Sequence, residues 1–134
     1  MKLHSSGEDY LKTIYILQKE KGTVRSIDVA EQMGVSKASV SHAVKLLRKG
    51  GYILMDDDYT LHLTDLGCEI AEMLYERHQY FTEQLTGVGV DVATAEAEAC
   101  KMEHTISDST FQKLKGQEQK LCPFADTCDL KQGK

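Results

Sequence analysis

The chain has 134 residues, 41% of them hydrophobic and 28% charged, which is the composition of an ordinary soluble globule of one domain or two small ones. No apolar run approaches the ~20 residues that span a bilayer, and residues 1–7 contain no apolar signal core. We therefore expect a cytoplasmic protein without a membrane partner, whose four cysteines are thiols or metal ligands rather than disulfides.

The net charge of −5 is unevenly distributed along the chain. Residues 1–64 carry nine Lys and Arg against eight Asp and Glu, whereas residues 65–134 carry seven against thirteen. A nearly neutral first half is compatible with binding to a phosphate backbone. An acidic second half is compatible with cation binding or with dimerisation.

Hydrophobic periodicity predicts three helices in the first third of the chain, over residues 8–20, 27–33 and 37–49. Ser26 and Ser36 stand where the second and third helices would be capped. The period then changes to alternation over residues 52–55 and 59–63, on either side of the acidic triplet 56–58, which predicts a β-hairpin. Three more helices are expected after the hairpin, over residues 66–85 (capped by Thr64 or Asp65), 91–106 and 109–120.

The second and third predicted helices form a helix-turn-helix pattern, with Ala30 where the helices cross and Gly34 in the turn. The outward face of the third helix carries short donors and cations suited to phosphates and base edges: Ser36, Lys37, Ser39, Ser41, His42 and Lys45. A plain helical pair with a solvated polar face is the alternative. The order helix, turn, helix, hairpin within residues 26–64 favours DNA binding with the hairpin as the wing, although carboxylates at 56–58 should repel phosphate.

Four potential metal ligands of the predicted fifth helix fall within an arc of about 100°: Glu96, Cys100, Glu103 and His104. A thiol, carboxylates and an imidazole on one face provide half of a site for Fe²⁺, Mn²⁺, Co²⁺, Ni²⁺ or Zn²⁺. One helix cannot close a metal sphere, so Asp9 and His78 are candidates for the remaining ligands. The alternative is a buried cysteine that acts as a small hydrophobe beside a surface Glu-His pair.

The longest distinctive string is Glu98-Ala99-Cys100-x-x-Glu103-His104-x-Ile106-Ser107-Asp108. Shorter motifs precede it: Glu8-Asp9-Tyr10-Leu11 leading to Ile14-Tyr15, Ala30-Glu31, Val35-Ser36, Val40-Ser41, Leu63-Thr64-x-x-Gly67 and Arg77-His78. Through these motifs, residues 5–118 resemble the iron- and manganese-dependent repressors, the DtxR/MntR family.

The resemblance implies a mainly α fold: a winged helix-turn-helix over residues 1–64, a helical dimerisation and metal-binding region over 65–120, and a cysteine-containing tail over 121–134. It implies a short form without the extra C-terminal domain of longer members. It also implies a homodimer that binds palindromic operator DNA when loaded with Fe²⁺ or Mn²⁺ and represses metal-uptake genes. Zn²⁺, Co²⁺ or Ni²⁺ are expected substitutes in vitro.

Carried over by position, the resemblance implies one metal site with His78 in or beside a second, the ligands of the first being Asp9, Cys100, Glu103 and His104. It implies DNA contacts at the start of the third helix, from Ser36, Lys37, Ser39 and His42. Two departures from the family pattern concern the metal site. Asp9 is typical of manganese-type members and Cys100 of iron-type members, and Lys12 stands where manganese-type members have another carboxylate. Glu96 is a candidate replacement ligand for the second site.

The tail contains Cys122 and Cys128, whose spacing is not that of a zinc finger. Two alternatives to metal-activated repression follow: a thiol redox-sensing DNA-binding regulator, and a metal-buffering protein without DNA specificity. We do not expect an enzyme. Cys100 and His104 would lie on one helix, without a glycine-rich or strand-end setting for a substrate.

Overall fold

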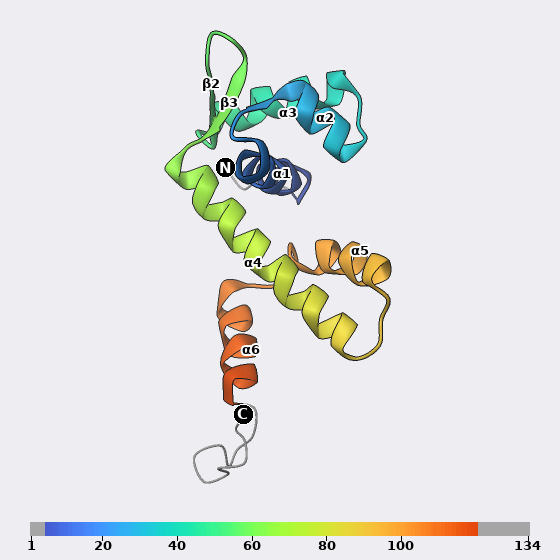
Figure 1. Ribbon diagram of the computed structural model, residues 1–134. Helices are drawn as coiled ribbons and strands as arrows, with labels where there is room; N and C mark the ends of the chain where they lie inside the picture. Colours follow the sequence, from blue (N-terminus) through green and yellow to red (C-terminus); the bar gives the residue numbers. More distant parts are fainter. Residues whose placement is uncertain (1–4, 121–134) are drawn as a thin grey trace. The chain divides into compact units, whose positions relative to one another are not determined.

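The computed structural model describes residues 5–120 of the chain, and its elements are labelled in Figure 1. Two compact units divide between His104 and Thr105. The second unit contains α6 (Asp108–Lys120), and every other element belongs to the first. The predicted mainly α fold with a winged helix-turn-helix is confirmed. Among the described residues, no helix has the length and apolar character needed to cross a bilayer.

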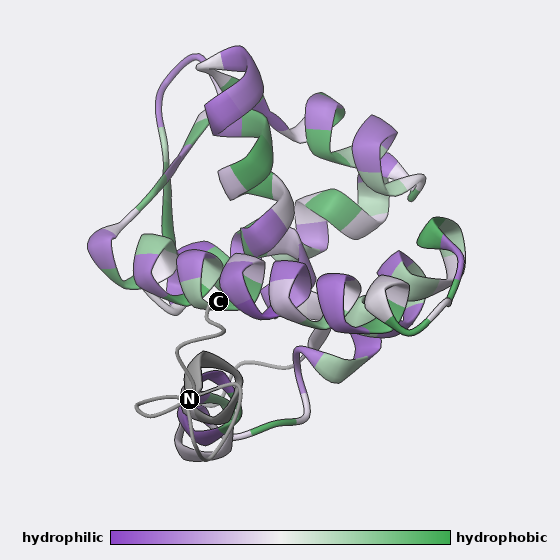
Figure 2. Ribbon diagram, turned by 60° about the horizontal axis from the view of Figure 1, so that its bottom comes forward, coloured by the Kyte–Doolittle hydropathy of each residue, from purple (hydrophilic) through white to green (hydrophobic). Residues whose placement is uncertain are grey.

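The first helix, α1 (Ser5–Lys21), begins three residues before the predicted range and ends one residue after it. It buries residues at helical spacing: Tyr10, Leu11, Ile14, Tyr15 and Leu17. Its exposed side carries polar and charged residues, and the hydropathy colours of Figure 2 show both kinds of residue along the helices.

The helix-turn-helix consists of α2 (Ser26–Met33) and α3 (Lys37–Lys49). Gly34 ends α2 with φ 68°, a left-handed conformation that glycine adopts without strain. Ser36 caps α3 as predicted, because its hydroxyl accepts a 3.1 Å hydrogen bond from the backbone N–H of Ser39. The predicted cap at Ser26 is wrong: Ser26 is the first helical residue, and the N–H of Arg25 before it donates to the Asp28 carboxylate.

The wing is the antiparallel hairpin of β2 (Ile53–Met55) and β3 (Thr60–Leu63), in the predicted place. The acidic triplet 56–58 and Tyr59 connect the two strands. The sequence pattern did not indicate β1 (Val24–Arg25), which pairs with the other edge of β3 and gives the strand order β1-β3-β2. The loop between α1 and α2 is thereby fixed to the wing.

The long helix α4 (Asp65–Gly87) begins at the cap Thr64, and α5 (Val92–Met102) begins at the cap Asp91. The predicted fifth helix extended to residue 106, and this is wrong. The carbonyl oxygen of Glu103, just after the end of α5, accepts a hydrogen bond from the Arg77 guanidinium of α4. Cys122 and Cys128 lie outside the described residues.

The core of the first unit forms around α1, which packs against α2, α3, the sheet and α4. Its fully buried aliphatic residues include Leu11, Ile14, Val29, Val40 and Leu61. In turn α4 packs against both α1 and α5 (Figure 1). The helix that supports the helix-turn-helix, α1, also faces the segment at the end of α5.

Candidate metal centre and candidate DNA interface

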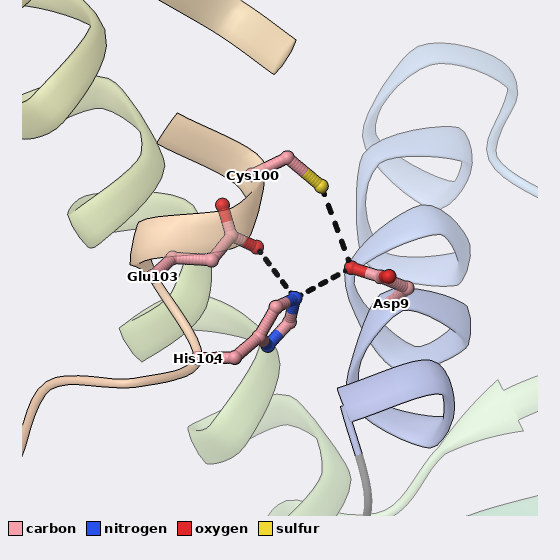
Figure 3. Close-up of side chains that lie close together, drawn as sticks. All are labelled: Asp9, Cys100, Glu103 and His104. Atoms are coloured by element: carbon pink, nitrogen blue, oxygen red, sulfur yellow. Dashed lines mark hydrogen bonds and ion pairs between the residues drawn. The ribbon is translucent and has the colours of Figure 1, made fainter. Parts of the chain in front are cut away.

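Four side chains with the chemistry of metal ligands lie together where α1 faces the end of α5 (Figure 3). Asp9 extends from α1, Cys100 lies in the last turn of α5, and Glu103 and His104 follow that helix. One potential ligand atom from each residue lies within 4.8 Å of those of the others. The cluster joins segments that are 91 residues apart in the sequence.

The donor atoms of the cluster converge on the Asp9 carboxylate. Its Oδ1 lies 2.8 Å from His104 Nε2 and 3.7 Å from Cys100 Sγ. Glu103 Oε2 lies 3.6 Å from the same His104 nitrogen. Two carboxylates, a thiol and an imidazole form a mixed hard and soft donor set, which fits a divalent first-row transition metal.

The Cys100 thiol is half-buried, and burial raises its pKa. The ammonium of Lys12 opposes this shift, whereas the carboxylates of Asp9 and Glu103 add to it. The thiol form donates toward Asp9. A metal that binds Sγ must therefore displace this proton, as is general for thiolate ligands.

Glu103 is fully buried, and three residues from two helices hold it. Its Oε2 accepts a 2.6 Å hydrogen bond from the Lys12 ammonium of α1, and its Oε1 lies 2.9 Å from His78 Nδ1 of α4. Its backbone carbonyl accepts from Arg77 at 3.2 Å. A buried carboxylate needs such partners, because an uncompensated charge in the interior is costly.

Glu8 contacts the cluster from outside, and sequence reasoning did not single it out as a site residue. Its Oε1 lies 2.7 Å from His104 Nδ1, on the side of the ring opposite Asp9. When Nδ1 carries the ring proton, it donates to Glu8 and leaves Nε2 with a lone pair directed at the cluster. Carboxylates commonly orient metal-binding histidines in this way.

The other predicted metal ligands lie outside the four-residue cluster. His78 contacts Glu103 Oε1, and its side chain is 23% exposed. Glu96 is exposed on α5 and is not among the clustered residues. The expected common arc on one helix does not form, because α5 ends at Met102 and the turn after it places Glu103 and His104 instead.

All six predicted DNA contacts are exposed on or just before α3: Ser36, Lys37, Ser39, Ser41, His42 and Lys45. Two of the hydroxyls contact each other, with Ser36 donating to Ser39 at 3.0 Å. Basic residues continue along the same helix. Arg48 and Lys49 follow Lys45 at its C-terminal end, and sequence reasoning did not single them out.

A groove runs between α3 and the wing, lined by Lys45 and Arg48 of α3 and by Met55 and Tyr59 of the wing. The wing tip itself is acidic, and its carboxylates have local partners. Asp56 lies 2.6 Å from His62 Nε2. Asp58 accepts hydrogen bonds from the side chain and the backbone N–H of Thr60, and these lower its pKa.

These features define a class of protein: a winged helix-turn-helix protein whose supporting helix contributes to a candidate transition-metal centre. Residues 2–59 match the family described as iron dependent repressor, N-terminal DNA binding domain. Residues 64–123 match iron dependent repressor, metal binding and dimerisation domain. The protein belongs to this family of metal-dependent transcriptional repressors, and the resemblance to the DtxR/MntR group is confirmed.

Individual relatives cover most of the chain. An uncharacterised HTH-type transcriptional regulator of Methanocaldococcus jannaschii is 31% identical over 84% of this chain and 92% of its own length. The diphtheria toxin repressor of Corynebacterium diphtheriae is 32% identical over 84% of this chain and 50% of its own. The solved structure of the manganese regulator SloR matches with a TM-score of 0.74 at 30% identity, over 89% of this chain. This chain spans 55% of SloR, about half of its length.

Proposed function

We propose that this protein is a metal-activated transcriptional repressor. It binds a palindromic operator as a homodimer when Fe²⁺ or Mn²⁺ occupies its metal site, and it controls genes for metal uptake. The observation that carries this proposal is the cluster between α1 and the end of α5, whose four members we propose as the ligands: Asp9, Cys100, Glu103 and His104. His78 supports the site through Glu103.

The position of the cluster gives a physical route from metal to DNA. Asp9 belongs to α1, and α1 packs directly against α2, α3 and the sheet. An ion bound by Asp9 together with Cys100 and His104 ties the winged helix to α5. Binding energy of this ion then favours one placement of α3, which is what a ligand-dependent population shift requires.

The proposed DNA interface is the exposed face at the start of α3: Ser36, Lys37, Ser39, Ser41, His42 and Lys45. We propose residues 1–64 as the DNA-binding part and 65–120 as the part that dimerises and binds metal. The match of residues 64–123 to a metal binding and dimerisation domain supports this assignment. Two identical reading helices related by a two-fold axis fit a palindromic operator.

The donor set supports both iron and manganese as activating metals. Cys100 supplies a soft sulfur that favours Fe²⁺, whereas Asp9 and Glu103 supply hard oxygens that suit Mn²⁺. Relatives support the same pair, because SloR is named a manganese regulator and the matched family is named for iron. Zn²⁺, Co²⁺ and Ni²⁺ are proposed as substitutes in vitro.

The test is fluorescence anisotropy of the full chain on DNA from upstream of its own gene, at one fixed physiological salt concentration. Binding is compared in chelator, in Mn²⁺ and in anaerobic Fe²⁺. We expect one metal to tighten binding by about tenfold or more, which is about 1.4 kcal/mol of coupling. The variant His104→Ala should lose this increase in affinity. The matched control is His62→Ala, in the wing and outside the cluster. It should keep the metal-dependent increase, whatever its affinity for DNA in chelator.

Three outcomes contradict the proposal in different ways. Tight binding that ignores metal but responds to oxidant favours the thiol redox sensor. Metal binding without specific DNA affinity favours the metal buffer. A metal response that persists in His104→Ala shows that the activating ion binds elsewhere in the chain.

A further inference from the structure

Lys12 is a buried lysine whose ammonium lies among the proposed metal ligands. Its side chain is 9% exposed, and lysine is rarely buried without a charged partner. The Nζ atom lies 2.6 Å from Glu103 Oε2 and 3.7 Å from Cys100 Sγ. A fixed positive charge thus contacts two of the four groups that would bind a metal.

The Lys12 ammonium contacts the Glu103 oxygen that a metal in the cluster would need. Oε1 is directed at His78, at 2.9 Å. Oε2 is the oxygen on the side of His104, 3.6 Å from Nε2, and it is also the oxygen that accepts from Lys12. A metal bound by Glu103 and His104 together would therefore share Oε2 with the Lys12 ammonium.

Sharing this oxygen is unfavourable for two reasons. The lone pair that the ammonium engages is withdrawn from the metal. In addition, a divalent cation about 4 Å or less from an ammonium is strongly repelled where water does not screen the charges. Because Glu103 is fully buried, screening at this contact is weak.

We propose that Lys12 is a tethered counter-cation of the metal site, an inference that rests on the proposed function. In the metal-free protein its ammonium neutralises Glu103 and holds α1 against the end of α5. A metal must displace it from Glu103 Oε2 in order to bind. Lys12 therefore sets the metal concentration at which the protein responds, although it is not itself a ligand.

The first experiment is a metal titration of the full chain with Mn²⁺, in competition with a chelator of known affinity. Lys12→Met removes the charge and keeps most of the apolar stem. Lys19→Met is the matched control, because Lys19 is an exposed lysine of the same helix whose ammonium lies over the Tyr15 ring, 4.8 Å from its centroid. We expect Lys12→Met to bind Mn²⁺ about tenfold more tightly or better, and Lys19→Met to bind as the wild type does. Equal or weaker binding by a folded Lys12→Met protein would overturn the proposal.

If Lys12→Met does not fold, a second measurement on the wild-type chain tests whether metal displaces Lys12. An amine-reactive reagent labels lysines with and without saturating Mn²⁺, and mass spectrometry compares Lys12 with Lys19 as the internal reference. We expect metal to raise the labelling of Lys12 relative to Lys19, and an unchanged ratio would contradict displacement. If the wild-type chain binds no Mn²⁺, Fe²⁺ or Co²⁺ in the same titration, the proposed function fails, and this inference fails with it.

Discussion

The contact between Glu8 and the imidazole of His104 shows how a residue outside the proposed ligands can orient one of them. Both ring nitrogens lie close to carboxylate oxygens, Nδ1 to Glu8 and Nε2 to Asp9. Only the second of these faces the cluster of potential ligand atoms, so Glu8 acts on the orientation of the ring and on the position of its proton. Its side chain is 21% exposed, and a change there leaves the core intact.

Removal of the Glu8 carboxylate should weaken metal binding without removing a ligand. We expect Glu8→Ala to lower Mn²⁺ affinity by about 10- to 100-fold, the usual cost of losing a partner that orients a metal-binding histidine. Glu20→Ala is the control, because it removes the same charge from the exposed end of α1. Competition titration measures both variants. Equal losses in the two would indicate a general charge effect and contradict the assigned role.

At the scale of single residues, the sequence predicted the members of the cluster but not the residues that contact them. Cys100, Glu103 and His104 were predicted because their spacing and residue types are those of a metal half-site. Asp9 and His78 could be named only as candidates from pattern, and position in the family motif singled out Asp9. Nothing in the local sequence of α1 shows that Glu8 and Lys12 contact residues about ninety positions later, because such contacts depend on how helices pack.

Among the elements, the wing and α4 meet at a closely packed junction. Thr64 caps α4 by accepting from the N–H of Gly67, and its hydroxyl donates to the carbonyls of Gly51 and Tyr52. The backbone of Gly67 passes so close to the Tyr52 carbonyl that a Cβ at this position would overlap the oxygen. Glycine is required here by close backbone approach, although it weakens the helix locally.

Gly67→Ala should therefore destabilise the protein despite the better helix propensity of alanine. We expect a loss of about 1–3 kcal/mol in the free energy of unfolding, because the backbone must shift to relieve the overlap. Gly87→Ala is the control in the same helix, where a Cβ would meet nothing within 4 Å. Urea unfolding followed by circular dichroism gives both values. A Gly67→Ala protein as stable as Gly87→Ala would show that the junction adapts freely.

Element boundaries illustrate what periodicity can and cannot supply. Caps with a side-chain acceptor were readable, and Ser36 and Thr64 lie at the predicted starts of α3 and α4. The end of α5 at Met102 could not be predicted from periodicity, because residues 103–106 contain no glycine or proline to mark a helix end. The two-residue strand β1 is too short to produce an alternating pattern, so only its pairing with β3 reveals it.

Over the whole molecule, the distribution of charge fits the proposed direction of DNA approach. The chain is acidic overall, yet α3 exposes Lys37, Lys45, Arg48 and Lys49 along one helix. The wing tip at residues 56–58 carries the opposite charge and should stay away from phosphate. We therefore expect phosphate contacts to come from α3 and the groove beside it, with little contribution from the tip of the wing.

The salt dependence of operator binding tests this arrangement and the number of subunits together. Each lost phosphate contact lowers the slope of log affinity against log salt by about 0.9. In a homodimer Lys45→Gln removes one contact from each subunit, so we expect the slope to fall by about 1.8. Lys113→Gln is the control, since Lys113 is exposed on α6 outside the winged helix. Anisotropy titrations with saturating metal at several salt concentrations give the slopes.

A fall of about 0.9 would indicate that only one subunit contacts DNA through Lys45. An unchanged slope would place this lysine away from the phosphates and would contradict the proposed interface at the groove.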